Sequence, residues 1–288
     1  MKRPKSFVSI ILGLLFLVNV LAWIEVYNLT QLQILEVTFF DVGQGDSIFI
    51  QTPQKHQILI DGGPDSTILE KLGEEMPFGD RTIDLIILTH PEHDHMAGLL
   101  EVLQRYEVEQ VLWTGIKRNT AEYRKWQELI KEEKAKITIA RMGQKITTRP
   151  GLVVDILYPF ENLEGQEVKN TNNSSIITRL VFGENTFLFT GDAYKSVERE
   201  LVKRDISLDS DVLKVGHHGS KTSSSEEFIQ VVSPEIAVIQ CGKDNPYGHP
   251  YPETLAILEK FGIKILRTDI NGDIKIISNG FDCRVETR

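Results

Sequence analysis

The sequence has few cysteines, no excess of basic charge and no low-complexity tract. Its two cysteines, Cys241 and Cys283, cannot form a four-cysteine zinc site, and their pairing is left open. Acidic residues outnumber basic ones by 41 to 32, which argues against broad, sequence-independent coating of duplex nucleic acid, because such coating needs a basic face. The hydrophobic share of 41% and charged share of 25% are typical of a globular protein and exclude a disordered chain or a polytopic membrane protein.

One long apolar run is present, at the amino terminus. Three basic residues come before FVSIILGLLFLVNVLAWI, and the next charge is Glu25. About 17–25 such residues span a membrane, and the basic flank predicts that the rest of the chain lies outside the cytoplasm. A cleaved signal peptide ending near VLA (20–22) explains the same pattern. A core helix is disfavoured because the run has no polar face. Residues 1–30 are therefore predicted to be a membrane anchor or a signal peptide.

Residues 31–288 are predicted to form one α/β domain. Strand-like runs such as DLIILT alternate with amphipathic helix-like runs such as AGLLEVLQRY. SIITRLVFG and NTFLFTGD are joined by a Gly-Glu-Asn turn, which indicates a hairpin. Many strands with interspersed helices favour sheets covered by helices, and the polar segment 161–173 is predicted to be a loop.

The segment LTHPEHDHMAG places four metal-ligand residue types directly after an apolar strand. These are His90, Glu92, Asp94 and His95, and such imidazoles and carboxylates suit zinc, manganese or iron. His93 falls between these positions and is predicted not to be a ligand.

Three later segments carry further candidates at predicted strand ends or in fixed loops. Asp192 in LFTGDAY has a carboxylate that can bridge two cations. His217 and His218 in LKVGHHGSKTSSS can supply a ligand and a proton donor, and His249 lies in a loop rich in proline and glycine. Each segment taken alone is also compatible with an ordinary turn or loop.

These segments, in this order, resemble the metallo-β-lactamase superfamily, and specifically its ComEC competence-protein branch. The resemblance covers about residues 36–261 and rests on separate segments: FFDVGQGDSIFI, LIDGGP, LTHPEHDHMAG, NTNNSSIITRL, FLFTGDA, DVLKVGHHGSKTSSSEEF and NPYGHPYPETL. It implies a four-layer αββα sandwich, here preceded by one hydrophobic helix, with a metal site at one edge of its two sheets. It also implies hydrolysis, with nuclease or phosphodiesterase activity expected.

The resemblance implies a ligand set for one or two divalent ions, zinc or manganese. The residues at the family's ligand positions are His90, Glu92 in the place of the second histidine, Asp94, His95, Asp192 as the bridging carboxylate, and His217 or His218. We favour His217, which is nearer the strand end.

Two departures from the family pattern are visible. No histidine stands between His95 and His217, and Asn172 and Asn173 occupy the region where the third histidine is usual. We therefore expect the first ion to be loosely held, or to be manganese. ComEC proteins carry many membrane spans, whereas this chain has one apolar run, so it cannot form a DNA channel alone.

The remaining site predictions concern the surroundings of the ions. Asp61 is predicted to orient a ligand histidine. Asp41 is predicted, like Asp61, to contact the ligands without binding the ion itself. Catalytic roles are assigned to Asp94, Asp192, His218 and His249, with either histidine donating a proton to the leaving oxygen. Substrate binding is assigned to Asn173, Ser220 and Lys221.

The predicted function is that of a membrane-anchored, extracytoplasmic metal-dependent phosphodiesterase or nuclease. The expected substrate is single-stranded DNA, and a separate membrane channel protein is an expected partner in DNA uptake. One alternative is hydrolysis of a small phosphodiester, such as cell-wall phosphorylcholine, or of a lactone. Another is a non-catalytic metal-binding adaptor of a DNA-uptake complex.

Overall fold

The computed structural model describes residues 5–30, 33–148, 151–204 and 206–288, and in the first helix it describes the side chains of residues 8–23. The chain divides into two units, Met1–Gln33 and Ile34–Arg288. The first unit contains helix α1 (Lys5–Thr30), which confirms the predicted amino-terminal helix. Its role as a membrane anchor or signal peptide stays a prediction.

Within the part of the chain that the structure describes, no helix is both long enough and apolar enough to cross a membrane.

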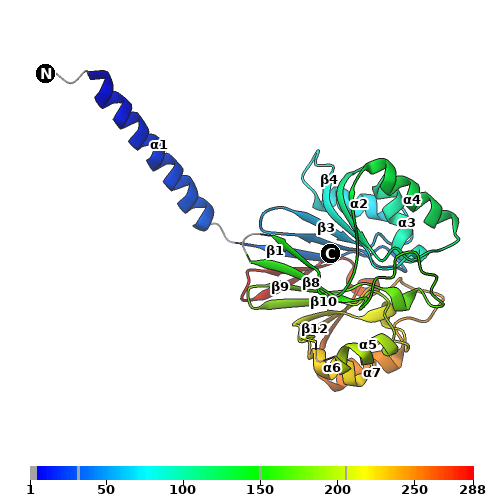
Figure 1. Ribbon diagram of the computed structural model, residues 1–288. Coiled ribbons are helices and arrows are strands. Elements are labelled where there is room, and N and C mark those ends of the chain that lie inside the picture. The colour runs from blue at the N-terminus through cyan, green and yellow to red at the C-terminus, as the bar shows by residue number, and fades with distance from the viewer. Residues whose placement is uncertain (1–4, 31–32, 149–150, 205) are drawn as a thin grey trace. The chain divides into compact units, whose positions relative to one another are not determined.

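The second unit is built on two β-sheets that lie face to face (Figure 1). In spatial order, the first sheet contains β15 (Cys283–Thr287), β14 (Ile274–Ser278), β1 (Leu35–Phe39), β2 (Ile48–Gln51), β3 (Gln57–Ile60), β4 (Thr82–Leu88), β5 (Glu107–Trp113) and β6 (Lys136–Ile139). The second contains β13 (Lys264–Arg267), β12 (Ile236–Ile239), β11 (Val212–Lys214), β10 (Asn185–Phe189), β9 (Ile177–Phe182), β8 (Leu152–Tyr158) and β7 (Lys145–Thr148).

Helices cover the outer face of each sheet. The first sheet carries α2 (Thr67–Glu75), α3 (His93–Val102) and α4 (Ala121–Glu133), and the second carries α5 (Lys195–Lys203), α6 (Glu226–Val232) and α7 (Pro252–Lys260) (Figure 1). Short helices η1 (Asn172–Ser174), η2 (Gly216–Gly219) and α8 (Thr268–Asn271) lie in the connections. The predicted four-layer αββα sandwich is confirmed.

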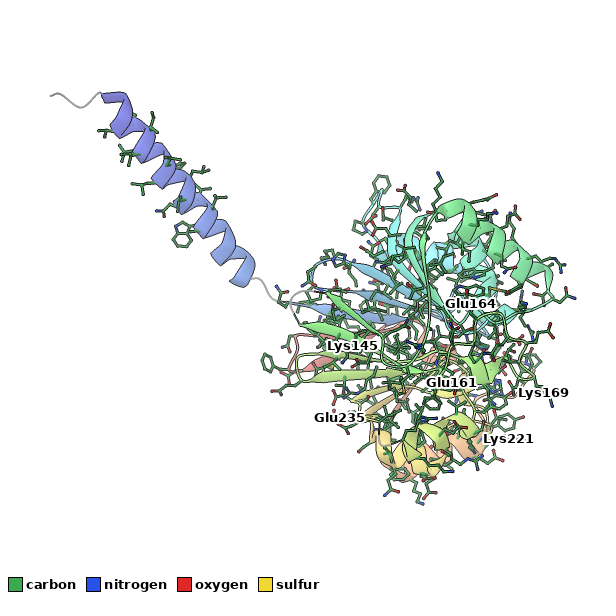
Figure 2. The ribbon with its side chains drawn as sticks, in the orientation of Figure 1. Lys145, Glu161, Glu164, Lys169, Lys221 and Glu235 are labelled. Atoms are coloured by element: carbon green, nitrogen blue, oxygen red, sulfur yellow. The ribbon has the colours of Figure 1, made fainter. Side chains whose placement is uncertain are left out.

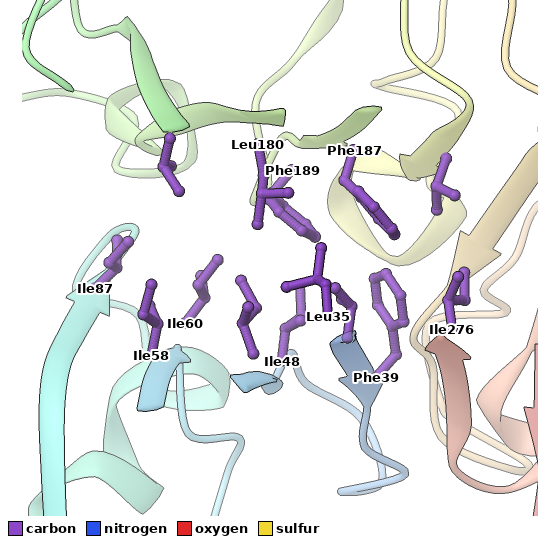
Figure 3. Packing of buried hydrophobic residues seen from close by; sticks show 14 of the residues in the cluster. Leu35, Phe39, Ile48, Ile58, Ile60, Ile87, Leu180, Phe187, Phe189 and Ile276 are labelled. Carbon is purple, nitrogen blue, oxygen red and sulfur yellow. The ribbon is translucent and has the colours of Figure 1, made fainter. Parts of the chain in front are cut away.

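The central strands are apolar on both faces because each sheet is covered there on both sides. In β2, Ile48 and Ile50 point into the core between the sheets, whereas Phe49 packs in the cluster that includes α2 and α3. Figure 3 shows the central core, in which residues of the first sheet such as Phe39 face Phe187 and Phe189 of the second. This packing holds the two sheets in a fixed relation.

The strand directions determine where the functional loops meet. Strands β3 to β6 pair in parallel, and so do β10 to β13. The carboxyl ends of β10 and β11 therefore lie at the same edge of their sheet, and the loops after them emerge together. The predicted segments around Asp192 and His217 both come directly after these strands.

Candidate metal centre

The first group of site residues lies in the connection between β4 and α3. Strand β4 ends at Leu88, and Glu92 is the N-cap of α3, so Asp94 and His95 lie in its first turn. The side chains of His90 and His95 are fully buried, and their ring centroids are 4.2 Å apart. A strand end followed at once by a helix start thus presents two imidazoles and one carboxylate to the same space.

Asp192 and the histidine pair come from the loops after β10 and β11. The Oδ2 of Asp192 is 3.4 Å from Nε2 of His95, 3.5 Å from Nε2 of His218 and 4.0 Å from Nε2 of His90. His217 and His218 both have left-handed backbones, with φ of 48° and 53°. Non-glycine residues adopt this conformation at a cost, which the surrounding structure must offset. The turn aims the His218 ring inward.

Four residues together form a cluster that can hold a cation. The ligand atoms of Asp94, His95, Asp192 and His218 all lie within 4.8 Å of one another. Three of the four residues are buried, while the side chain of Asp94 is 33% exposed and opens the cluster to solvent. Within the described residues, Nε2 of His95 and Oδ1 of Asp192 are buried without a hydrogen-bond partner. Buried polar atoms of this kind normally have a partner, and a divalent ion would supply it.

The electrostatics of the cluster also fit a cation. Burial by itself would raise the pKa of Asp192, but the neighbouring His218 and His95 hold it well below its usual range. Burial would lower the pKa of His218, yet Asp192 and Asp46 raise it to about 10. The carboxylates of Asp192 and Asp46 therefore stay ionised and attract positive charge. A bound metal ion would displace the proton of His218, because metal binding and proton release are coupled at such sites.

A comparison with known protein families agrees with this fold and cluster. A family model described as the metallo-β-lactamase superfamily matches residues 40–243. The chain belongs to this superfamily. Its residues thus form the domain and the ligand cluster of a metal-dependent hydrolase.

Among curated relatives, the chain is 34% identical to ComE operon protein 3 of Bacillus subtilis, over 83% of this chain and 32% of that protein. It is 32% identical to competence protein ComA of Neisseria gonorrhoeae, with the same two coverages, 83% and 32%. The chain thus spans about a third of the length of these relatives. The match confirms the resemblance to the ComEC branch.

Solved structures share the fold at low sequence identity. The metallo-β-lactamase fold protein YhfI of Bacillus subtilis has a TM-score of 0.58 at 15% identity, covering 85% of this chain and 100% of that one. A metallo hydrolase from Ignicoccus hospitalis has a TM-score of 0.52 at 15% identity, covering 84% and 98%. These likenesses establish the metallo-β-lactamase fold.

Glu92, a predicted ligand, is not among the four residues of the cluster. Its Oε1 is 3.0 Å from the guanidinium of Arg118 and also accepts a hydrogen bond from the hydroxyl of Thr171. At the N-cap the side chain turns toward this cation, away from the cluster. The residue in the position of the superfamily's second histidine is therefore held by an ion pair. His93 also lies outside, 3.6 Å from Glu122.

The structure also distinguishes the two adjacent histidines. His218 belongs to the four-residue cluster, and its Nδ1 lies 3.0 Å from the carbonyl oxygen of Gln240. His217 lies at the margin, with Nε2 3.8 Å from Asp192 and Nδ1 2.8 Å from the hydroxyl of Thr222. The structure thus places His218, rather than the favoured His217, among the four.

Asp61 lies directly behind His95. Its Oδ2 is 2.8 Å from Nδ1 of His95 and accepts a hydrogen bond from the hydroxyl of Thr89, while Oδ1 accepts one from the Thr89 amide. Such a carboxylate fixes the orientation of a ligand imidazole and leaves Nε2 facing the ion. Asp41, in contrast, lies outside this arrangement. Its Oδ1 accepts a hydrogen bond from the Gly43 amide, and its described contacts do not reach the cluster.

Two functional residues were missed from sequence, Asp46 and Lys214. Asp46 takes the position predicted for Asp41, since its Oδ1 is 3.2 Å from Nδ1 of His218 and its Oδ2 pairs with the ammonium of Lys214. The same ammonium donates to the carbonyl of Gly191 at 3.0 Å. Lys214 is only 1% exposed. A lysine inside the apolar strand DVLKVG was the sequence signal, because lysine is almost never buried unless paired.

The other predicted residues surround the cluster at different distances. The His249 ring lies 6.1 Å from the His218 ring, and burial together with His218 and His217 lowers its pKa to about 4. Asn172 reaches Asp192, with 3.5 Å between Nδ2 and Oδ2. His249 and Asn172 thus lie beside the cluster.

The three residues assigned to substrate binding have other contacts. Asn173 donates to Ser196 and accepts from the Tyr194 amide, so both ends of its side chain are engaged. The hydroxyl of Ser220 accepts from Thr222, and the exposed Lys221 ammonium lies 5.2 Å above the ring of Tyr251. Their role in binding substrate stays a prediction.

Proposed function

We propose that this chain hydrolyses phosphodiester bonds of single-stranded DNA outside the cytoplasm, as part of DNA uptake. The observation that carries the proposal is the four-residue cluster of Asp94, His95, Asp192 and His218. It stands in a superfamily domain whose curated relatives include a competence protein. A phosphodiester is the bond that a nuclease hydrolyses.

The four cluster residues would hold the ion, which is zinc or manganese. When bound, such an ion lowers the pKa of water toward about 7 and neutralises phosphate oxygens. Asp61 keeps the His95 ring in its ligating orientation through the hydrogen bond at Nδ1. His249 lies beside the cluster with a lowered pKa, so at neutral pH its ring is uncharged and would hydrogen-bond to water or to the leaving oxygen, and the proton that the leaving oxygen needs would come from water.

A second ion would find fewer ligands. His90 offers a buried Nε2 that has no partner among the described residues, and it lies 4.0 Å from the shared carboxylate of Asp192. Glu92 is held by Arg118, and His217 stays at the margin. We therefore propose that an ion at His90, which is the first metal site of the sequence prediction, binds more weakly than the ion held by the four-residue cluster and is better suited to manganese than to zinc.

The proposal places the domain on the outer side of a membrane, attached through α1 or released after cleavage. The basic flank and apolar run of residues 1–24 support this placement. Separating membrane and soluble fractions and sequencing the mature amino terminus tests it. A chain found in the cytosolic fraction would refute the extracytoplasmic placement.

The activity is tested on the purified 288-residue chain, stripped with chelator and titrated with manganese or zinc. Cleavage of single-stranded DNA and of a small aryl phosphodiester is measured for the original chain, for Asp94→Asn and for Asp282→Asn. Asp282 is an exposed carboxylate on a distant turn and serves as the matched control. We expect Asp94→Asn to abolish metal-dependent DNA cleavage and Asp282→Asn to retain it.

The outcomes separate the alternatives. If neither chelation nor Asp94→Asn reduces DNA cleavage, the metallonuclease proposal is wrong. If only the small phosphodiester or a lactone is cut, the substrate belongs to that smaller class. If the chain binds the ion tightly and cuts none of these substrates, it is a metal-binding adaptor.

A further inference from the structure

A cavity of about 910 Å³ lies at the carboxyl end of β5 and is open to solvent. It is lined by Trp113 of β5, the loop that leads into α4, the first turns of α4, and the loop 164–168. Its volume falls within the range of about 300–1,000 Å³ that is usual for small-ligand sites. Figure 2 labels Glu164, which lines this cavity.

Arg118 joins the cavity to the metal centre. It lines the cavity, and its guanidinium is 3.0 Å from Oε1 of Glu92. Glu92 stands between His90 and Asp94 in the loop that carries the metal ligands. A ligand that contacts Arg118 in the cavity is therefore connected, through Glu92, to the loop that carries the metal ligands.

The walls of the cavity are preformed. The amide of Lys117 donates to the carbonyl of Gln166 at 2.8 Å, and the amide of Gly165 donates to the carbonyl of Gly115 at 2.9 Å. These two bonds fasten the loop 164–168 to the loop after β5. Gly115 has a φ of 71°, and an added Cβ would lie 3.1 Å from Cα of Glu164, so the close approach of the loops needs glycine.

The lining has the chemistry of a nucleotide site rather than a phosphate site. Its cations, Lys117 and Arg118, are balanced by two acids, Glu164 and Glu167, whereas a site for bare phosphate would be cationic. Nε of Arg118 is buried and has no hydrogen-bond partner within the described part of the chain.

The uncharged residues of the lining suit a base. Asn119 and Gln127 offer amide donors and acceptors, while Trp113 and Tyr123 are buried in the core and border the cavity with only small parts of their rings. The edges of a base carry donors and acceptors that such amides can pair with.

We propose that this cavity binds one nucleotide of a single-stranded polynucleotide, adjacent to the phosphodiester that is cut. The base lies against the amide side chains of the lining, and the flanking phosphate lies at Lys117 and Arg118. This inference rests on the proposed function and specifies where the substrate chain runs. It also accounts for the acidic composition, because a single nucleotide is held by a mixed lining and no basic face is needed.

The test measures binding without cleavage. A fluorescent single-stranded oligonucleotide is titrated with the chelator-treated 288-residue chain, and its anisotropy is recorded at several salt concentrations. The variants are Lys117→Glu, which reverses a lining charge, and Gln127→Trp, which fills the cavity. Lys131→Glu is the matched control, because Lys131 is an exposed lysine of the same helix that does not line the cavity.

We expect both cavity variants to weaken binding about tenfold, which corresponds to about 1.4 kcal/mol, and Lys131→Glu to bind like the original chain. A mononucleotide should compete for the site and inorganic phosphate should not. If the cavity variants bind as the control does, or if inorganic phosphate competes equally, the nucleotide site is refuted. If the cavity variants weaken binding but the chain shows no metal-dependent cleavage, the proposed nuclease function is refuted and the proposed nucleotide site is supported.

Discussion

Replacement of Lys214 by methionine tests the buried charges behind the metal cluster. Methionine keeps most of the side-chain volume and removes the ammonium. The ammonium pairs with Asp46, donates to the Gly191 carbonyl at 3.0 Å and lies 3.8 Å from Oδ1 of Asp192. In Lys214→Met the carboxylate of Asp46 stays buried, at 2% exposure, and loses its ammonium partner, so that His218, with Nδ1 3.2 Å from Oδ1 of Asp46, is left as its cationic neighbour.

The size of the effect is set by this burial. Removing one partner of a buried ion pair costs about 3–5 kcal/mol, because the remaining charge is left uncompensated. Changing Asp46 to Asn at the same time removes that charge, so the double variant should lose less stability than Lys214→Met alone. Exposed ion pairs contribute only about 0–1 kcal/mol. The exposed Lys131→Met is therefore the control.

The assay is chemical denaturation followed by circular dichroism, together with calorimetric titration of manganese. We expect Lys214→Met to lower the free energy of unfolding by about 3–5 kcal/mol. We also expect weaker manganese binding, because the Gly191 carbonyl bonded to Lys214 comes immediately before Asp192 in the chain. If Lys214→Met is as stable as Lys131→Met and binds manganese as tightly, the argument for a supporting ion pair is wrong.

Three further predictions concern the metal site and the thiols. Glu92→Gln should leave the manganese dissociation constant unchanged, whereas Asp94→Asn should raise it strongly; a large effect of Glu92→Gln in calorimetry would return Glu92 to the ligand set. Asp61→Asn should weaken metal binding by about 10–100-fold, and equal affinity would show that the hydrogen bond to His95 has no orienting role. Burial and Asp269 raise the pKa of Cys241 to about 12, and burial raises that of Cys283 to about 11. At about pH 8 both are therefore thiols, and mass spectrometry should find Cys241 unalkylated by iodoacetamide until the chain unfolds, so rapid native labelling of Cys241 would contradict its burial.

Local patterns predicted much of the fold because they report on burial within one element. The apolar run DLIILT forms β4, and the apolar residues on both faces of β2 reflect a sheet covered on both sides. The Gly-Glu-Asn hairpin also forms between β9 and β10. Order along the chain could not show that β10 and β11 are parallel neighbours, which brings the Asp192 and His218 loops together.

The side-chain directions at the metal centre were beyond sequence reasoning for a similar reason. Glu92 matched a ligand position, but Arg118 and Thr171, which are distant in sequence, turn it away. Of the two acids in DVGQGDS, Asp46 rather than Asp41 reaches the site, because the buried Lys214 on another sheet pairs with it.

The sequence by itself determined the apolar periodicity of the layers, the superfamily's spaced motif, and the local set of His90, Asp94 and His95, which one strand end and one helix start hold together. Only the tertiary structure decided which charges become partners. It brought His218 rather than His217 into the four-residue cluster, and it formed the cavity that Arg118 lines. The physical reason is that a charge is stabilised by whichever opposite charge the fold packs against it, and that neighbour is set by the packing of two sheets.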